Sequence, residues 1–347
     1  MDPQVYQQLA EDGIQELLAR EHAVAWLEVE AKLAETPTQN APRGLNPHHL
    51  LNAKRALLER DVLKEITEPT RGGQVIPIIV PADTKRGERA VHDAAARKRL
   101  LMARYLSWSA AQGKVPNLIG VAGERVCHAS LMEAAPAGYV LLKPKGGEIV
   151  SLFNREVPGG ALDDAAHLLL TDDSGKPIGT ATVLVEVKNL RHWIYPESAE
   201  LYQLLDKSAR LQLANPDVRF VPVLALRRAH YTTFRMAKDL GFFIAQARAQ
   251  FILPRSEVTP EALNEVRTEL GFLDLERREA SYPTLTRAFS TSIMAVAVTA
   301  SNKFKAAAEL TEHFRELRMQ KDTNMRHESM DRLREAAATI QGVKGGW

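Results

Sequence analysis

The chain has 347 residues, of which 45% are hydrophobic and 25% charged, with Lys+Arg 45 against Asp+Glu 43. This composition is that of a globular protein with room for about two domains, and it excludes a disordered or fibrous chain. Because Cys127 is the single cysteine, an intrachain disulfide and a cysteine-based zinc or redox site are excluded as well. The N-terminus has no secretory pattern, and no apolar run approaches the ~20 residues of a membrane span, so we expect a cytoplasmic protein without membrane attachment.

The first 83 residues combine helical patterns with a hairpin. Apolar residues recur at helical spacing over residues 4–35, which predicts two helices. Asn46 can cap a third helix over residues 48–66. Two short strands around a turn at Gly72 complete the segment. Three helices followed by a hairpin are typical of a winged helix, so residues 1–83 are predicted to form a winged-helix-like domain.

Residues 84–114 are predicted to form a basic connecting helix. Residues 85–104 contain seven Lys or Arg and two Asp or Glu, a local net charge of 7 − 2 = +5. Such a stretch either follows a phosphate backbone or is the solvated face of a helix.

Strands and helices alternate from residue 115 onward, which predicts an α/β fold. Two of the strands are nearly continuous in Val and Leu, which is typical of a mixed sheet covered by helices on both faces. After them, residues 257–347 are predicted to form a helical C-terminal extension. The predicted strands are residues 138–144, 162–170, 180–189 and 218–228, and the predicted helices are residues 123–133, 198–213 and 232–251.

Charged side chains interrupt two of the most apolar predicted strands. Glu186 and Lys188 lie two residues apart on one strand and therefore point to the same face. Asp163 and Asp164 open the preceding strand, and antiparallel pairing through the intervening turn brings one of them beside Glu186. Converging carboxylates form an oxygen site for a hard cation such as Mg²⁺, and a neighbouring ammonium can orient or activate a water. The alternative is a half-exposed strand whose Glu and Lys face solvent.

Asp163, the Glu186-Val-Lys188 triplet and the helix and strand that follow resemble the core of the PD-(D/E)xK nuclease superfamily, which has a restriction-endonuclease-like fold. The resemblance covers residues 115–251, within a predicted nuclease core of residues 115–256. Leu162 stands where the motif's name has proline. The resemblance implies a nuclease that hydrolyses phosphodiester bonds of DNA with Mg²⁺ or Mn²⁺, in defence against foreign DNA or in repair.

The resemblance also implies roles for individual residues. Asp163 and Glu186 would hold the metal ion, and Lys188 would orient or activate the attacking water. Glu124, on the helix before the first core strand, is the candidate third acid, for a second ion or for the water network. Of the two neighbouring aspartates we prefer Asp163 as the ligand, because Asp164 would then point to the opposite face.

Five further residues are weaker candidates. Gln203 matches a position on the following helix where several branches of the superfamily carry a polar residue facing the site, although a solvent-facing glutamine is equally compatible with the pattern. His192 and Trp193 either stack on a base or, for the tryptophan, pack against the core. Arg227 and Arg228 follow the next core strand, where they either contact phosphates or are solvated.

A fold does not fix a function, so two other classes remain open. The first is a catalytically silent DNA-binding or assembly protein with a nuclease-like fold. The second is an enzyme of unrelated chemistry that uses the same carboxylates. The partners expected from the sequence are DNA and either a second copy of the chain or another protein, bound through the N-terminal or C-terminal helices.

Overall fold

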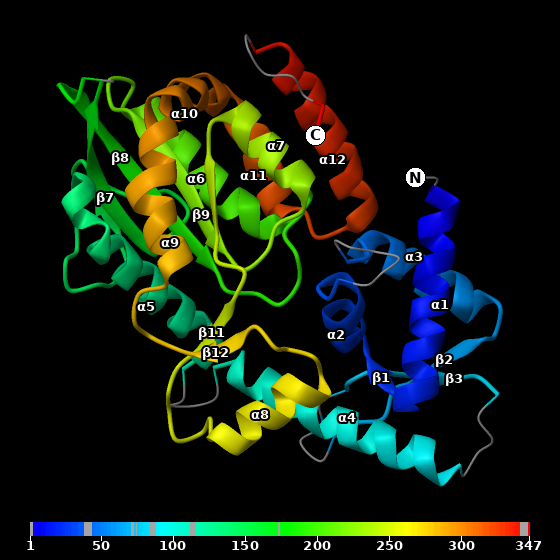
Figure 1. The fold of residues 1–347 in the computed structure, drawn as a ribbon. Coiled ribbons are helices and arrows are strands. Elements are labelled where there is room, and N and C mark those ends of the chain that lie inside the picture. The colour runs from blue at the N-terminus through cyan, green and yellow to red at the C-terminus, as the bar shows by residue number, and fades with distance from the viewer. Residues whose placement is uncertain are drawn as a thin grey trace. The chain divides into compact units, whose positions relative to one another are not determined.

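The structure is a computed structural model that describes residues 3–37, 44–70, 73, 75–83, 88–111, 116–172, 174–340 and 346–347 (Figure 1). The chain divides into two compact units. The first comprises residues 1–118 and 254–275, and the second residues 119–253 and 276–347. The turn at Gly72 and the basic residues Lys85 and Arg86 lie outside the described residues.

The first unit contains helices around a small antiparallel sheet. The sheet has the order β1-β3-β2. The elements are α1 (Pro3–Glu21), β1 (Val24–Ala25), α2 (Trp26–Val29) with the π-helical turn Glu30–Ala34, α3 (Pro47–Glu59), β2 (Leu63–Ile66), β3 (Ile78–Pro81), α4 (Arg89–Trp108) and α8 (Pro260–Glu269).

Helix α3 begins where the sequence predicts and ends earlier. The Asn46 side chain accepts a hydrogen bond from the His48 amide at 2.9 Å, which is the expected N-cap. The helix does not continue to residue 66, because it ends at Glu59 and Asp61 then adopts a positive φ of 53°. The following residues instead form β2 against β3.

Basic side chains of α4 form ion pairs with acidic residues of the first unit. Lys98 is buried and contacts Glu28 at 2.6 Å and Glu21 at 3.0 Å, and Glu28 is itself fully buried. Arg97 contacts Glu269 of α8 at 2.6 Å. These bases therefore hold the first unit together, and for them the expectations of a phosphate track or a solvated face were wrong.

Residues 254–275 belong to the first unit, although the sequence analysis places residues 254–256 in the nuclease core and residues 257–275 in the C-terminal extension. Besides Arg97, a second α4 base, Arg104, pairs with Glu265 on α8. The Tyr105 and Phe272 rings stack edge to face with centroids 5.0 Å apart. Such contacts between residues far apart in sequence leave no local pattern, so the boundary at residue 257 could not anticipate them.

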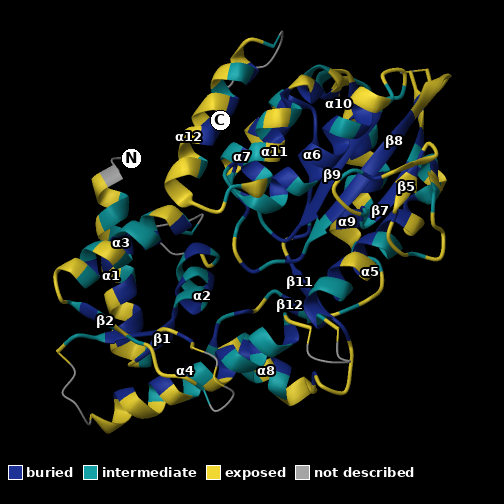
Figure 2. Cartoon of the chain, turned by 180° about the vertical axis from the view of Figure 1, so that it is seen from behind, coloured by how far each residue is buried: buried dark blue, intermediate teal, exposed yellow. Residues whose placement is uncertain are grey.

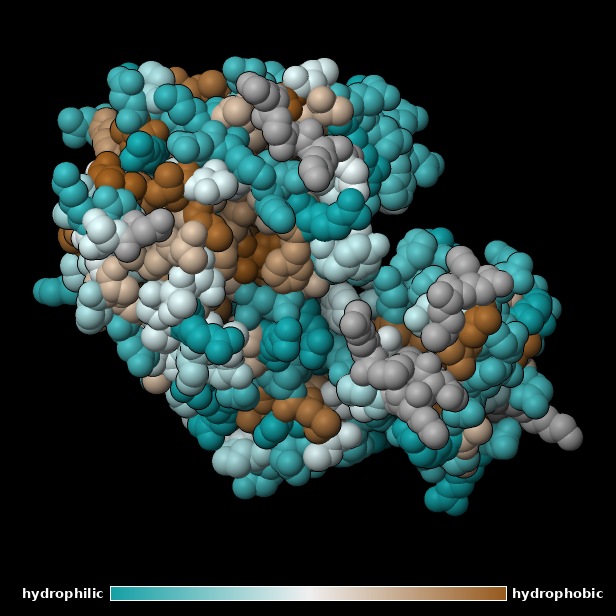
Figure 3. Space-filling model, turned by 45° about the horizontal axis from the view of Figure 1, so that its top comes forward, coloured by the Kyte–Doolittle hydropathy of each residue, from teal (hydrophilic) through white to brown (hydrophobic). Residues whose placement is uncertain are grey.

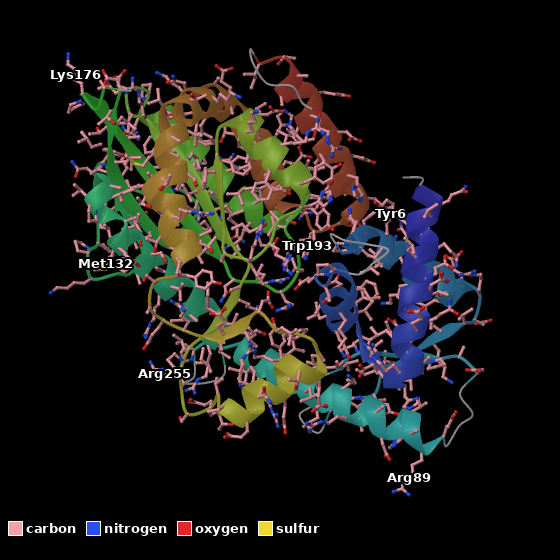
Figure 4. All side chains as sticks on the ribbon, in the orientation of Figure 1. Tyr6, Arg89, Met132, Lys176, Trp193 and Arg255 are labelled. Carbon is pink, nitrogen blue, oxygen red and sulfur yellow. The ribbon has the colours of Figure 1, made fainter. Side chains whose placement is uncertain are left out.

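Replacing Lys98 by methionine is expected to lower the free energy of unfolding by about 3 kcal/mol, because the buried Glu28 carboxylate loses an ammonium group that balances its charge. Arg89 on the same helix is the matched control. Its side chain points into solvent and meets Asp93 only at 3.5 Å (Figure 4), so Arg89→Met should change stability by less than about 0.5 kcal/mol. Urea denaturation of both variants measures the difference, and equal losses would contradict the structural role.

The second unit is built on a five-stranded mixed sheet with the order β10-β9-β8-β7-β4. Strand β7 pairs antiparallel with both β4 and β8, whereas β8, β9 and β10 run parallel to one another. This confirms the α/β class predicted from the sequence. The five strands of this sheet are β4 (Tyr139–Leu141), β7 (Asp164–Thr171), β8 (Pro177–Lys188), β9 (Phe220–Leu226) and β10 (Phe243–Gln246). Two separate pairs are formed by β5 (Ser151–Leu152) with β6 (Arg155–Glu156) and by β11 (Gln250–Ile252) with β12 (Leu275–Arg277).

Helices cover both faces of this sheet. Helices α5, α9 and α10 lie on one face, and α6 and α11 lie on the other (Figure 1). Strand β9 and residues 181–186 of β8 are accordingly buried between the two helical layers, whereas residues 177–180 of β8 are exposed (Figure 2). The helices are α5 (Leu118–Glu133), α6 (Ala199–Ala214), α7 (Tyr231–Leu240), α9 (Pro283–Arg287), α10 (Met294–Ala307), α11 (Thr311–Met319) and α12 (Thr323–Ala338).

The helix predicted over residues 232–251 is wrong from its middle onward. Helix α7 ends at Leu240, and Gly241 takes a left-handed conformation with φ 80° as its C-cap. The next residues, Phe243 to Gln246, form β10 parallel to β9. Aromatic and β-branched residues directly after a glycine favour this strand.

No helix in the part of the chain that the structure describes is long and apolar enough to cross a membrane.

Candidate active site

The charged residues of the two apolar strands meet at one end of the sheet. Strands β7 and β8 pair with Asp164 opposite Val185, so Asp163, one residue earlier, comes opposite Glu186. The hairpin tip that joins the strands lies at their far end, where Lys176 points into solvent (Figure 4). The predicted juxtaposition of an aspartate with Glu186 is therefore present.

Asp163 is half-buried beside the β8 backbone. Its Oδ2 atom accepts a hydrogen bond from the Val187 amide at 2.5 Å. Burial raises the pKa of Asp163 to about 7, and the negative charge of Glu186 adds to the rise, whereas the Val187 amide and the Lys188 ammonium oppose it. The two carboxylates thus repel each other in this site, and a bound cation would relieve the repulsion.

Glu186 lies between two ammonium groups. It is only 4% exposed, and its two carboxylate oxygens contact Lys188 Nζ and Lys207 Nζ, each at 2.9 Å. Lys207 comes from α6 and is 5% exposed, and it also donates to the Ala161 carbonyl at 2.5 Å. Lys188 is less enclosed, with 16% of its side chain exposed against 6% for Lys207. Lys207 therefore fixes Glu186 from inside, and Lys188 is the ammonium that reaches solvent.

The sequence analysis did not identify Lys207. One signal was present, because Lys207 lies three residues after Leu204 and four before Leu211 on α6, which places a lysine on an apolar helix face. A buried lysine on such a face needs an anionic partner, and Glu186 on the adjacent strand is that partner.

Replacing Lys207 by methionine is expected to destabilise the protein by about 3 kcal/mol, because Glu186 loses one of its two buried partners. Lys207→Arg should recover part of this loss, since a guanidinium can still pair with the carboxylate. Urea denaturation of the two variants gives the comparison. Equal stability of Lys207→Met and wild type would show that the ion pair is not formed.

Asp164 points to the opposite face from Asp163. Its Oδ2 atom lies 2.7 Å from His128 Nδ1 on α5, and its Oδ1 atom accepts from the Ala165 amide at 2.8 Å. His128 also was not identified from the sequence. Its Nε2 atom is buried and has no hydrogen-bond partner among the described residues. Asp163 is therefore the aspartate beside Glu186, and Asp164 orients a histidine.

A pocket of about 410 Å³ opens beside these residues. Asp163, His128 and Glu124 contribute to its walls, so the structure brings the predicted third acid into the same pocket as Asp163. The pKa of Glu124 is raised, first by its removal from water and then by the negative charge of Glu148. The other lining residues are Val121, Arg125, Ala129, Lys145, Gly146, Gly147, Glu148 and Glu279.

A close contact between α5 and the end of β8 sets the position of this pocket. The Asn189 side chain donates to the Ile119 carbonyl at 2.6 Å and to the Phe251 carbonyl at 2.7 Å. A Cβ atom on Gly123 would lie 2.5 Å from the Asn189 Cβ, so only glycine allows this approach. The contact fixes Glu124, which follows Gly123, relative to Lys188, which precedes Asn189.

Of the weaker candidates, Gln203 lies on α6, whereas His192, Trp193 and Arg228 lie in the segments that follow β8 and β9. Gln203 is half-buried four residues before Lys207, so it shares the α6 face that Lys207 directs toward Glu186. His192 is half-exposed, with its Nε2 atom 3.6 Å from a Glu200 carboxylate oxygen. The Arg228 guanidinium lies over the Trp193 ring at 5.8 Å from its centroid.

Arg227 is a structural residue. It is 1% exposed, and it donates to the Leu190 carbonyl at 3.2 Å and to the Arg191 carbonyl. A guanidinium enclosed in this way cannot reach a phosphate, so the expected nucleic-acid contact of Arg227 was wrong. The strongly apolar strand β9 that precedes it, which is buried throughout, was the available signal for burial.

Asp163 and Glu186 are the two carboxylates on which the expected magnesium site depends, and both Glu186 oxygens contact lysine ammonium groups. No group of three or more His, Cys, Asp or Glu side chains in the described ranges converges closely enough to hold a metal. Mg²⁺ is commonly held by only one or two carboxylates, with waters and substrate phosphates as the other ligands. Burial and the negative charge of Glu186 raise the pKa of Asp163, and a nearby cation would oppose the effect of that charge.

Comparisons of the chain with family models, with curated proteins and with solved structures found no match. The site itself is therefore the basis for assigning a function.

Proposed function

We propose that the chain is a metal-dependent nuclease of the PD-(D/E)xK type that hydrolyses phosphodiester bonds of DNA. The observation that carries the proposal is the register that brings Asp163 opposite Glu186, with Lys188 on the same face of β8. The mixed sheet between α5 and α6 supports a restriction-endonuclease-like core. A role in defence against foreign DNA or in repair is part of the proposal.

Asp163 and Glu186 would hold Mg²⁺ or Mn²⁺ in this enzyme. The bound ion would supply Lewis-acid polarisation of the scissile phosphate and a more acidic water. The Lys188 ammonium, held by Glu186 at 2.9 Å and partly open to solvent, would orient the attacking water. Glu124, across the pocket, would accept a hydrogen bond from the same water network.

The first unit would bind duplex DNA as a winged-helix-like module. Its elements α1, β1, α2, α3, β2 and β3 and the sheet order β1-β3-β2 support this assignment. His48 and Arg55 lie seven residues apart on one face of α3, and both are exposed. This face is the proposed DNA contact.

Arg55→Glu is expected to weaken duplex binding about tenfold, because it removes a basic contact and adds a negative charge against the phosphates. Arg89→Glu is the control, since it makes the same charge change at an exposed position on α4. Fluorescence anisotropy with a labelled duplex at fixed salt measures both variants. Equal weakening by the two would show that only net charge matters, not the α3 face.

The enzyme assignment is tested by incubating plasmid and single-stranded DNA with the protein in Mg²⁺, Mn²⁺ or chelator. Cleavage should require the metal and be lost in Glu186→Ala and Lys188→Ala. The second candidate is a catalytically silent DNA-binding or assembly protein, and one observation favours it: both Glu186 oxygens already contact lysines. That candidate wins if wild type and both variants bind DNA equally and none cleaves it.

A further inference from the structure

A second pocket, of about 420 Å³, lies in the second unit between α7, β10 and α10. It shares no lining residue with the pocket of Asp163 and Glu124. We propose that this groove, termed the α7–α10 groove, binds an acidic peptide segment of a partner protein that inserts one bulky apolar side chain. Its lining residues are Phe234, Ala237, Lys238, Gly241, Phe242, Phe243, Ile244, Val296, Thr299, Ala300 and Lys303.

The walls of the groove are apolar and open to solvent. Phe234 on α7 is 40% exposed and Val296 on α10 is 39% exposed. Ile244 of β10 and Phe242, the residue before β10, also line the groove. Hydrophobic residues gather in exposed patches on the surface of the protein (Figure 3). Exposed apolar surface rimmed by polar residues is typical of an interaction site.

The end of α7 approaches α10 closely beside the groove. Gly241 follows α7 with φ 80°, and a Cβ atom there would lie 2.3 Å from the Ala300 carbonyl oxygen and 2.4 Å from the Phe304 nitrogen. Glycine is therefore required for α7 to end against α10. The two helices therefore meet at this point, beside the groove-lining residues Ala300 and Lys303.

Two lysines line the groove near the point where α7 and α10 meet. Lys238 lies four residues after Phe234 on α7, and Lys303 lies seven residues after Val296 on α10, so each helix carries an apolar residue and then a lysine along the groove. The Lys303 Nζ atom donates to the Lys238 carbonyl at 2.8 Å, which holds its ammonium near that point. The groove thus combines apolar walls with two ammonium groups on its rim, near the point where the helices meet.

This polarity favours an acidic peptide over nucleic acid. Carboxylates of Asp, Glu or a chain terminus complement the two ammonium groups, and a Phe, Leu or Trp side chain complements the walls. A pocket of this size suits one large side chain with its neighbours. Binding to a DNA backbone requires a row of basic side chains along the phosphates, whereas this groove is lined by apolar residues such as Phe242 and Ile244.

The test is a selection of displayed random 12-residue peptides on the full-length protein, with counter-selection on the Phe234→Ser, Lys303→Glu double variant. Enriched peptides should combine an aromatic residue or Leu with Asp or Glu. By fluorescence anisotropy, the most enriched peptide should bind each single variant at least tenfold more weakly than wild type. Replacing its acidic residues by Lys should abolish binding.

Two matched controls keep the result specific. Leu213→Ser removes an apolar side chain that is 51% exposed on α6, and Lys305→Glu reverses a charge on α10 outside the groove. Neither should change peptide binding. Because Phe234 is on the surface, its variant should keep the wild-type melting temperature and its DNA cleavage, so this proposal and the nuclease assignment fail separately.

Four outcomes would overturn the proposal. The first is no enrichment over counter-selection, and the second is enrichment of basic peptides. The third is binding of a labelled duplex that Lys303→Glu abolishes, which would make the groove a DNA surface. The fourth is a dimer in light scattering that Phe234→Ser dissociates, which would make a second copy of the chain the occupant.

Discussion

Replacing Lys188 by methionine is expected to lower the rate of metal-dependent DNA cleavage by about 10² to 10⁴-fold, the range typical of a lost acid–base or water-positioning group. Lys188 is the ammonium of the site that reaches solvent, so it is the group that can meet an attacking water. Methionine keeps much of the apolar stem and removes the charge. The effect should therefore fall on turnover and leave DNA binding unchanged.

The fold should tolerate this substitution, because Glu186 keeps Lys207 as a buried partner at 2.9 Å. Lys176→Met provides the matched control, since Lys176 is an exposed lysine at the far tip of the β7–β8 hairpin. Single-turnover cleavage of a labelled duplex separates chemistry from binding. Equal rates for Lys176→Met and Lys188→Met would remove Lys188 from the mechanism.

Replacing Asp163 by asparagine is expected to abolish cleavage and, in the absence of metal, to stabilise the protein at pH 8. The loss of cleavage follows from the loss of one of two anionic ligands, which we expect to cost at least about 100-fold. The gain in stability follows from the pKa of Asp163, which rises from 3.8 to about 7 on folding because of burial and the charge of Glu186.

The direction of the pH dependence follows from proton linkage. Between pH 3.8 and about 7 the folded protein binds the Asp163 proton more tightly than the unfolded chain does. The free energy of unfolding of the wild type should therefore fall as the pH rises through this window, and the Asp163 contribution to this fall should be absent in Asp163→Asn.

Urea denaturation in chelator at pH 5 and pH 8 measures this difference. The variant should gain stability relative to wild type at the higher pH, and adding Mg²⁺ at pH 8 should stabilise only the wild type. A wild type that is as stable as the variant at both pH values would show that Asp163 and Glu186 do not repel each other. Such opposed effects on activity and stability are common at functional sites.

The register of β7 and β8 was predictable because it depends on local pattern. Alternation along the strand places Glu186 and Lys188 on one face, and pairing through the short turn brings one of the two aspartates beside Glu186. The structure places Asp163 there and directs Asp164 to His128 on α5. Strand periodicity was sufficient to bring an aspartate beside Glu186, and the register in the structure identifies it as Asp163.

Residues that depend on packing between distant segments could not be predicted in the same way. Lys207 meets Glu186 across α6 and β8, and His128 meets Asp164 across α5 and β7. The α4 bases were assigned to solvent or phosphate because their partners, such as Glu28 and Glu269, lie far away in sequence. In each case local composition gives the charge of the group and tertiary contact decides its role.

The most direct test of the proposed site is the position of Mn²⁺ in crystals of the protein soaked with the ion, located by its anomalous scattering. The proposal predicts an ion at about 2.1 Å from carboxylate oxygens of both Asp163 and Glu186, with the remaining ligands supplied by water. An ion bound instead at Asp164 and His128, or none near Asp163, would contradict it.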